Sequence, residues 1–150
     1  MEFFVEVRPR TKGNHRVMVR DRRGRPRLIP SRAAREVEIE LDLLLRPHAP
    51  RRPLSGPTRL DVDFVLPVPK SFTKAERAAA GAGQLLPVEA HHGDRGNFLK
   101  LIEDALQAAR FVVNDGQFCA GDVRKRFATA EDPRAGYWFR IQPIEIARPA

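Results

Sequence analysis

Residues Asp94 to Gln117 read DRGNFLKLIEDALQAARFVVNDGQ and hold the most regular pattern in the chain. The apolar residues recur at a period of 3.6, which predicts an amphipathic helix from about 97 to 110. A short apolar run follows at 111–113, and Asn114-Asp115-Gly116 is typical of a turn. The apolar positions of the helix are Phe98, Leu101, Ile102, Ala105, Leu106 and Ala109.

The flanking sequence predicts one small α+β domain over residues 1–150, a mixed β-sheet packed with two or three helices. Strand patterns occur at 3–7, 17–19, 58–66, 123–128 and 137–146, and Pro143 suggests that the last strand lies at a sheet edge. One helix is expected from an N-cap at Ser31 to Arg46, and another after the capping-box residues Thr73 and Glu76. A basic loop at 20–27 and a proline-rich loop at 47–57 separate these elements.

Composition narrows the class of protein. The chain has 150 residues, 42% hydrophobic and 31% charged, with a net charge of +8, which favours a folded protein with a polyanionic partner. This charge does not distinguish DNA from RNA or an anionic membrane surface. No apolar stretch is long enough to span a bilayer, so a cytoplasmic protein is expected. Cys119 is the only cysteine in the sequence, so neither an intrachain disulfide nor a cysteine-rich zinc site is expected. The adjacent His91 and His92 are a poor zinc chelate, because two neighbouring histidines rarely bind one ion.

Three aspartates in this stretch are candidates for phosphodiester chemistry. Asp94 precedes the helix, Asp104 lies on it, and Asp115 follows it. Clustered carboxylates bind hard cations such as Mg²⁺, which activate water and neutralise charge on a phosphate. A short return segment would bring Asp115 back towards Asp94, with Lys100 stabilising the developing charge. The alternative is ordinary local structure, with Asp94 as a first-turn charge and Asp115 as a turn residue.

The spacing Asp94-x-x-Asn97-x-x-Lys100-x-x-x-Asp104, followed by Asn114-Asp115-x-Gln117, resembles the signature of the RusA family of Holliday-junction resolvases. The resemblance implies a homodimeric, Mg²⁺-dependent endodeoxyribonuclease that cuts four-way DNA junctions in recombination and repair, in bacteria or phages. Mn²⁺ is an alternative cofactor. By position, the resemblance implies metal ligands at Asp94, Asp104 and Asp115, and catalytic roles for Asp94, Lys100 and Asp115. It also implies a DNA contact at Asn97, with Gln117 as the companion of Asp115.

The chain departs from the family signature at two acidic positions, where it has Gly96 and Asn114. Three hypotheses follow: an active enzyme with a rearranged ligand set, an enzyme of reduced activity, or a protein that binds junctions without cutting them. Fewer carboxylates weaken Mg²⁺ binding. The candidate replacements for the missing carboxylate are Asp61, Asp63, Glu103 and His92.

Basic residues crowd the first 27 positions and predict a phosphate-binding surface or arm, with a solvated basic face as the alternative. No base-reading motif is visible, so structure-specific recognition through the DNA backbone is expected. Phe72 and Phe118 are interpreted as core residues rather than wedges in an open junction. A general RNA- or nucleoprotein-associated protein is the remaining alternative. The predicted DNA-binding residues, besides Asn97, are Arg10, Lys12, Arg22, Arg23, Arg25 and Lys125.

Overall fold

The computed structural model describes residues 1–11, 16–89 and 92–145. Lys12 and His91 lie outside these ranges. The chain folds as a small α+β domain, as the sequence predicts. In chain order the elements are β1 (Glu2–Glu6), β2 (Arg16–Arg20), β3 (Pro26–Pro30), α1 (Arg32–Leu45), the short 3-10 helix η1 (Arg46–His48), β4 (Thr58–Leu66), α2 (Lys74–Gly81), α3 (Arg95–Ala108), the 3-10 helix η3 (Asp115–Gln117), β5 (Phe118–Ala120), β6 (Val123–Phe127) and β7 (Gly136–Pro143).

The main sheet is built around β4. Strand β7 pairs with β4 antiparallel on one side and with β1 on the other, while β5 and then β6 pair with β4 in parallel. Gly121 joins β5 to β6 with a φ of 145° and lies against the Leu60 carbonyl, where a side chain would overlap the β4 backbone. This close approach lets the two short strands follow one long neighbour.

Strand β7 is interior, so the expectation that Pro143 marks an edge strand is wrong. Pro143 is the last residue of β7, and β1 pairs with β7 only from Gly136 to Arg140. Ile141 donates its N–H towards the β1 side, to Met1, and Ile144 donates towards the β4 side, to Pro57. By alternation the Pro143 nitrogen points to the side where β1 has already ended, so no ladder hydrogen bond is lost.

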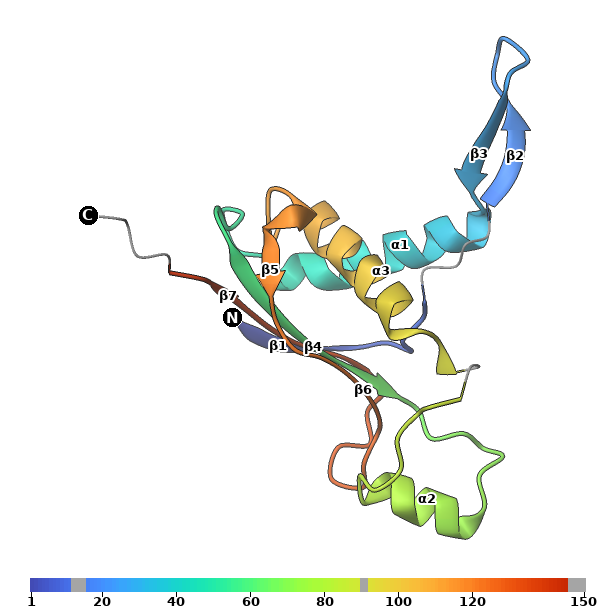
Figure 1. Cartoon of the computed structure of the whole chain (residues 1–150), viewed down its shortest axis with the longest axis vertical. Helices are drawn as coiled ribbons and strands as arrows, with labels where there is room; N and C mark the ends of the chain where they lie inside the picture. Colours follow the sequence, from blue (N-terminus) through green and yellow to red (C-terminus); the bar gives the residue numbers. More distant parts are fainter. Residues whose placement is uncertain (12–15, 90–91, 146–150) are drawn as a thin grey trace.

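One face of the sheet carries the core. Helices α1 and α3 cover it together, while α2 lies apart at the other end of the molecule (Figure 1). The alternation in β4 sends Leu60, Val62 and Phe64 into this core and sends Asp61 and Asp63 to the opposite face. Phe64 stacks on Phe98 of α3 with ring centroids 5.0 Å apart. The apolar face of α3 and the inward-facing residues of β4 therefore pack against each other, as the sequence predicts.

The helix starts follow the predicted caps. The Ser31 hydroxyl accepts a hydrogen bond from the Ala34 N–H, and Thr73 and Glu76 form a reciprocal capping box at the start of α2. Phe72 packs edge-on against Phe127, with 5.4 Å between ring centroids, and Phe118 packs against the core. The interpretation of both phenylalanines as core residues is confirmed.

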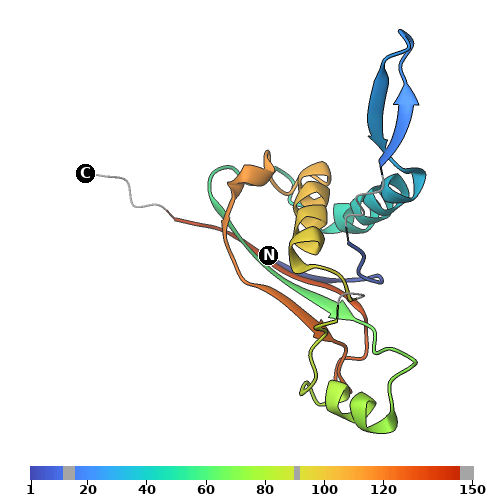
Figure 2. The same cartoon turned by 45° about the vertical axis from the view of Figure 1, so that its right-hand side comes forward.

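The basic loop expected at 20–27 is in fact the tip of a hairpin. Strand β3, which the sequence analysis missed, pairs antiparallel with β2 from Arg16–Pro30 to Arg20–Pro26. Asp21 accepts the N–H groups of Arg23 and Arg25 and so closes the turn. The hairpin projects away from the body at the N-terminal end of α1 (Figures 1 and 2).

Candidate active site

Asp94 is the N-cap of α3. Its Oδ1 accepts a hydrogen bond from the Asn97 N–H at 3.0 Å, and its backbone is extended with φ −80° and ψ 135°. An N-cap aspartate satisfies one of the free N–H groups of the first turn and complements the helix dipole. The Asp94 side chain is nevertheless exposed. The capping alternative is thus correct for one oxygen, while the residue as a whole stays exposed.

The loop before Asp94 is held from the sheet. Lys125 of β6 donates from Nζ to the Gly93 carbonyl oxygen at 2.7 Å. Gly93 has a φ of 82°, and a Cβ there would lie 2.7 Å from the Thr11 methyl and 2.8 Å from the Phe98 ring, so the position requires glycine. Lys125 was predicted to contact DNA. In the structure its side chain, in a half-buried residue, holds the backbone next to Asp94, and the DNA contact stays a prediction.

Gly96 lies directly beside the Asp94 carboxylate. A Cβ at Gly96 would be 3.1 Å from Asp94 Oδ1, with no other contact within 4 Å among the atoms that the structure describes. An aspartate here would therefore place two carboxylates side by side, with a small shift of the Asp94 side chain.

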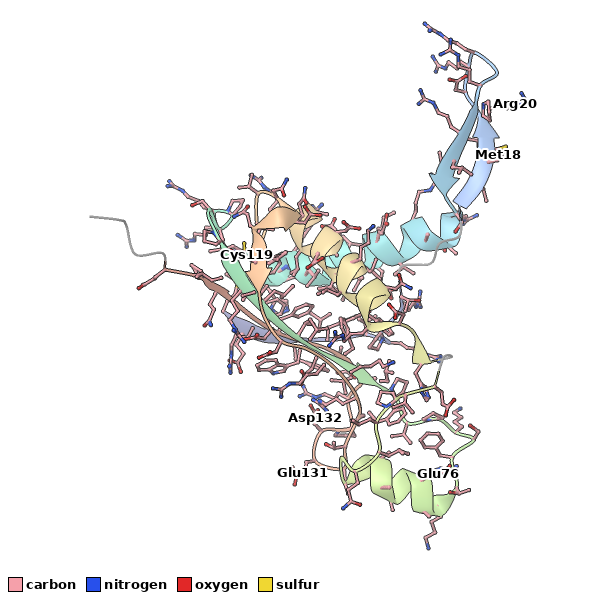
Figure 3. All side chains as sticks on the ribbon, in the orientation of Figure 1. Met18, Arg20, Glu76, Cys119, Glu131 and Asp132 are labelled. Carbon is pink, nitrogen blue, oxygen red and sulfur yellow. The ribbon has the colours of Figure 1, made fainter. Side chains whose placement is uncertain are left out.

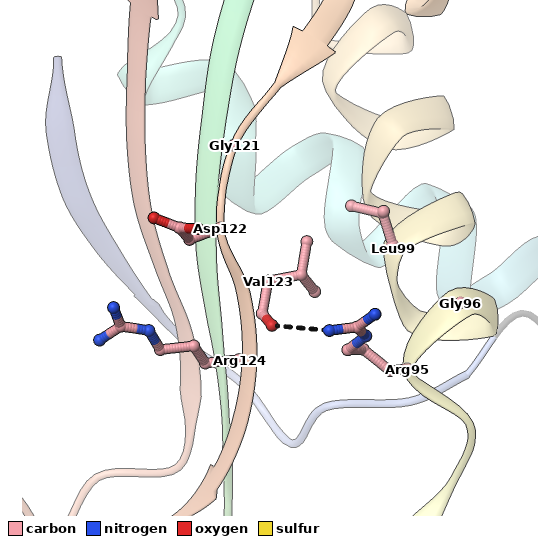
Figure 4. A pocket seen from close by; sticks show the side chains of 7 residues that line it. All are labelled: Arg95, Gly96, Leu99, Gly121, Asp122, Val123 and Arg124. Atoms are coloured by element: carbon pink, nitrogen blue, oxygen red, sulfur yellow. Dashed lines mark hydrogen bonds between the residues drawn. The ribbon is translucent and has the colours of Figure 1, made fainter.

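A shallow groove runs between the first turns of α3 and the start of β6 (Figure 4). Its volume is about 350 Å³, and Arg95 crosses it to donate to the Val123 carbonyl at 3.4 Å. The side chains of Asp122 and Arg124 point away from α3, to the other face of the strand (Figure 4). The groove is lined by Arg95, Gly96, Leu99, Gly121, Asp122, Val123 and Arg124.

Asp115 lies at the opposite end of α3 from Asp94. The helix has 14 residues, and a rise of about 1.5 Å per residue makes it roughly 21 Å long. After the helix, the Leu54 N–H donates to the Phe111 carbonyl and Leu54 forms a parallel bridge with Val112, which holds the chain at this end instead of returning it along α3. The expected return of Asp115 towards Asp94 is therefore wrong within a single chain.

Glu103 belongs to the Asp115 end of the helix. Burial raises the pKa of Glu103, and the charges of Asp115 and Asp104 raise it further. Lys100 and Asn97 lie further towards the helix start, and both are exposed. Among the described residues, no three His, Cys, Asp or Glu side chains come close enough to hold a metal ion.

Two of the other candidate replacements for the missing carboxylate, Asp61 and Asp63, lie away from Asp94. Asp61 and Asp63 lie on the face of the sheet away from α3, where Asp61 pairs with Arg59 at 2.9 Å and Asp63 with Arg126 at 3.3 Å. Burial alone would raise the pKa of Asp61, but the hydrogen bonds from Arg59 and the Asp122 N–H lower it below its ordinary value. His92 packs edge-on against Phe127, with centroids 5.2 Å apart. Within one chain, this geometry keeps Asp61 and Asp63 away from Asp94.

Gln117 has a structural role that sequence reasoning missed. Its Oε1 accepts the N–H groups of Val113 and Asn114, and its Nε2 donates to the carbonyls of Leu54 and Gly56. Asn114 in turn caps η3, and the Asp115 N–H donates to Gln107 Oε1 at 3.0 Å. Gln117 therefore joins the Asp115 turn to the loop that precedes β4.

The comparison with family models tells whether the spacing from Asp94 to Gln117 belongs to a family signature or is ordinary local structure. The sequence model of Endodeoxyribonuclease RusA matches residues 6–135. This chain belongs to the RusA family. The match runs from the end of β1 through β6, across the three described α-helices and the candidate residues Asp94, Asp104 and Asp115, so the signature from Asp94 to Gln117 is not a coincidence of spacing. RusA proteins are endodeoxyribonucleases that resolve Holliday junctions and generally depend on a divalent metal. No curated protein sequence gives a significant match to this chain. No helix in the described RusA fold is long and apolar enough to cross a membrane.

Proposed function

We propose that this RusA-family chain is a Mg²⁺-dependent endonuclease that resolves four-way DNA junctions, with Mn²⁺ as an alternative cofactor. The observation that carries the proposal is the presentation of Asp94. The α3 cap and the Lys125–Gly93 hydrogen bond fix its position, and its carboxylate is exposed beside a groove that Arg95 crosses. An oriented carboxylate next to cationic side chains suits a phosphodiester substrate with a hard metal ion.

One copy of the chain does not supply a complete metal site. Asp94 and Asp115 lie at opposite ends of a 14-residue helix, so they cannot bind the same ion within one chain. If both are ligands of one ion, as the family signature implies, they come from two copies of the chain. The proposed homodimer is then a requirement for metal binding and not only a match to the two-fold symmetry of the junction.

The chemistry is divided between the metal and the chain. A bound divalent ion would supply a water of lowered pKa and neutralise charge on the scissile phosphate. Asp94 is oriented for an ion by its bond to the α3 N-terminus. Arg95 and Lys100, within the first turns of α3, would place positive charge on the phosphate side. Asp104 completes the proposed ligand set at the Asp115 end.

Cleavage of a synthetic four-way junction tests this function. Wild-type protein with Mg²⁺ or Mn²⁺ should introduce paired nicks, and Asp94→Asn or Asp115→Asn should abolish them. Glu131→Gln, a change of the same charge at an exposed position in the β6–β7 connection, is the matched control and should cut normally. Absence of cleavage under all metal conditions, or normal cleavage by both aspartate variants, would contradict the proposal.

A second candidate is a junction-binding protein that does not cut. The observation that favours it is Gly96, which leaves Asp94 without the neighbouring carboxylate that the family signature has. Such a protein would bind branched DNA tightly, with a steep salt dependence, and would leave it intact. Introducing the acid at position 96 separates the two candidates.

A further inference from the structure

The β2–β3 hairpin, residues 16–30, is here called the arm. Among the described elements, β2 and β3 make their extensive contacts only with each other, and both drawings show the arm standing off the domain (Figures 1 and 2). A two-stranded hairpin with little packing against the rest of the fold is marginally stable in water. The arm is therefore shaped for a partner outside the chain.

The arm carries most of the net charge. It has six arginines and one acid, Asp21, for a net +5 of the chain's +8. Asp21 is occupied by the turn, because it accepts the Arg23 and Arg25 N–H groups and lies 3.6 Å from Arg27 Nε. The side chains of Arg22, Arg23 and Arg25 are exposed and form no ion pair with any described residue. Such a cluster favours a polyanion.

An apolar pair interrupts this basic surface. Met18 and Leu28 are cross-strand partners, 71% and 60% exposed, on the face that also carries Arg20 two residues along β2. Figure 3 shows Met18 and Arg20 on the outer part of the arm, away from the domain. Large apolar side chains that are this exposed, with arginines around them, would complement a partner whose surface is apolar at its centre and anionic around that centre.

The chain segment that precedes the arm passes beside the candidate active site. The Tyr137 hydroxyl accepts the Arg10 N–H at 2.9 Å, which fixes the chain just before the arm. The next residue, Thr11, lies so close to Gly93 that a side chain there would clash with its methyl group. At its other end the arm leads directly into α1 through Ser31. The chain segment that leads to the arm therefore contacts the Asp94 loop, and the arm itself continues into α1.

We propose that the arm binds branched DNA, with its arginines on the phosphates of one duplex and the Met18–Leu28 pair on bases unstacked at the branch point. This inference rests on the proposed function. A two-stranded ribbon fits the major groove, and methionine and leucine are side chains that proteins insert at unstacked base steps. A branch point offers such steps at low cost, since stacking is already interrupted there. The charge of the arm disfavours a second arm as its occupant.

The first experiment measures the charge contribution. Binding is measured in EDTA, in an Asp94→Asn background, to a four-way junction and to a linear duplex of the same sequence. Arg22→Gln/Arg23→Gln should weaken both and reduce the slope of log K against log salt by about two. Lys70→Gln/Lys74→Gln removes the same charge near α2, at the other end of the molecule, and should leave the slope unchanged. Equal slopes for wild type and the arm variant would overturn the inference.

The second experiment tests the apolar pair. Met18→Thr/Leu28→Thr keeps strand-forming residues and should weaken junction binding about tenfold, with little effect on the duplex. The increase in fluorescence of 2-aminopurine placed at the branch point should be lost with it. Ile39→Gln/Leu43→Gln removes an equally exposed apolar pair from α1 and should retain both signals. Thermal melting of each variant checks that the domain still folds.

The outcomes separate the inference from the function beneath it. If the arm variants bind and unstack the junction like wild type, the inference fails while junction cleavage by wild type still supports the function. If Met18→Thr/Leu28→Thr converts a dimer to monomers in light scattering and leaves the 2-aminopurine signal of bound DNA intact, the pair contacts a second copy and the inference is overturned. If wild type neither binds nor cuts branched DNA, both fail.

Discussion

The ammonium of Lys125 donates a 2.7 Å hydrogen bond to the carbonyl oxygen of Gly93, the residue immediately before Asp94. Lys125→Met removes this bond and should raise the Mg²⁺ concentration for half-maximal cleavage by about tenfold, because residues that orient metal ligands typically affect affinity by that amount or more. Lys125→Arg should recover part of the loss. The measurement is a metal titration of junction cleavage.

A control separates positioning from DNA contact. If Lys125 acts on the Asp94 loop, the Lys125→Met variant should bind the junction in EDTA as wild type does. Weaker binding in EDTA with an unchanged metal requirement would show that Lys125 is a DNA contact instead.

Restoring the acid at position 96 should strengthen the metal site. The Cβ of Gly96→Asp would lie 3.1 Å from Asp94 Oδ1, so a small shift of the Asp94 side chain would let the new carboxylate join the existing one. We expect Gly96→Asp to lower the Mg²⁺ concentration needed for cleavage, or to create cleavage if wild type has none. Gly96→Asn, of the same size without charge, is the control and should not do so. Equal behaviour of the two variants would attribute any effect to the helix backbone.

We expect the main effect of replacing Gln117 to be a lower free energy of unfolding. Its side chain makes four hydrogen bonds to backbone groups, at Val113, Asn114, Leu54 and Gly56. Each such bond contributes on the order of 1 kcal/mol, so Gln117→Ala should lower the free energy of unfolding by about 2–4 kcal/mol. Urea denaturation measures this, and exposed Gln142→Ala is the control. A loss of cleavage without a loss of stability would instead give Gln117 a direct catalytic role.

The raised pKa of Glu103 predicts that the stability of the fold depends on pH. Burial, Asp115 and Asp104 raise the pKa of Glu103 in the folded state, so its ionisation opposes folding. The cost is absent below the ordinary pKa of glutamate, where both states are protonated, and it appears as the pH rises through the folded pKa. Glu103→Gln should therefore raise the melting temperature near pH 7 and have little effect near pH 3. Destabilisation near pH 7 would contradict this reasoning.

Local patterns were sufficient for most of the fold. The apolar alternation of β4 and the apolar face of α3 each bury one side, and these periods are written in the sequence. Strand β3 was missed because PRLIP, with a proline at each end, is typical of a loop, and only pairing with β2 makes it a strand. Pro143 is tolerated in the interior strand β7 because β1 ends before it, and no residue of β7 encodes where β1 ends.

The site was predictable only in its local part. The signature placed Asp94 at the start of a helix correctly, because an N-cap depends on its immediate neighbours. The Lys125–Gly93 bond joins residues 32 positions apart in the chain, and no local signal announces it. The separation of Asp94 from Asp115 follows from the length of α3, but the path of the chain after the helix is fixed by contacts with Leu54.

That separation leads to a test with mixed subunits. If each metal site takes Asp94 from one copy and Asp115 from the other, a dimer of Asp94→Asn with Asp115→Asn has one intact site and one site lacking both acids. Co-expression of the two inactive variants with different tags should then restore single nicks, but not paired cuts, in a four-way junction. A mixture of Asp94→Asn with the double variant has no intact site and should stay inactive. If tagged heterodimers form and remain inactive, Asp94 and Asp115 do not share an ion across the dimer.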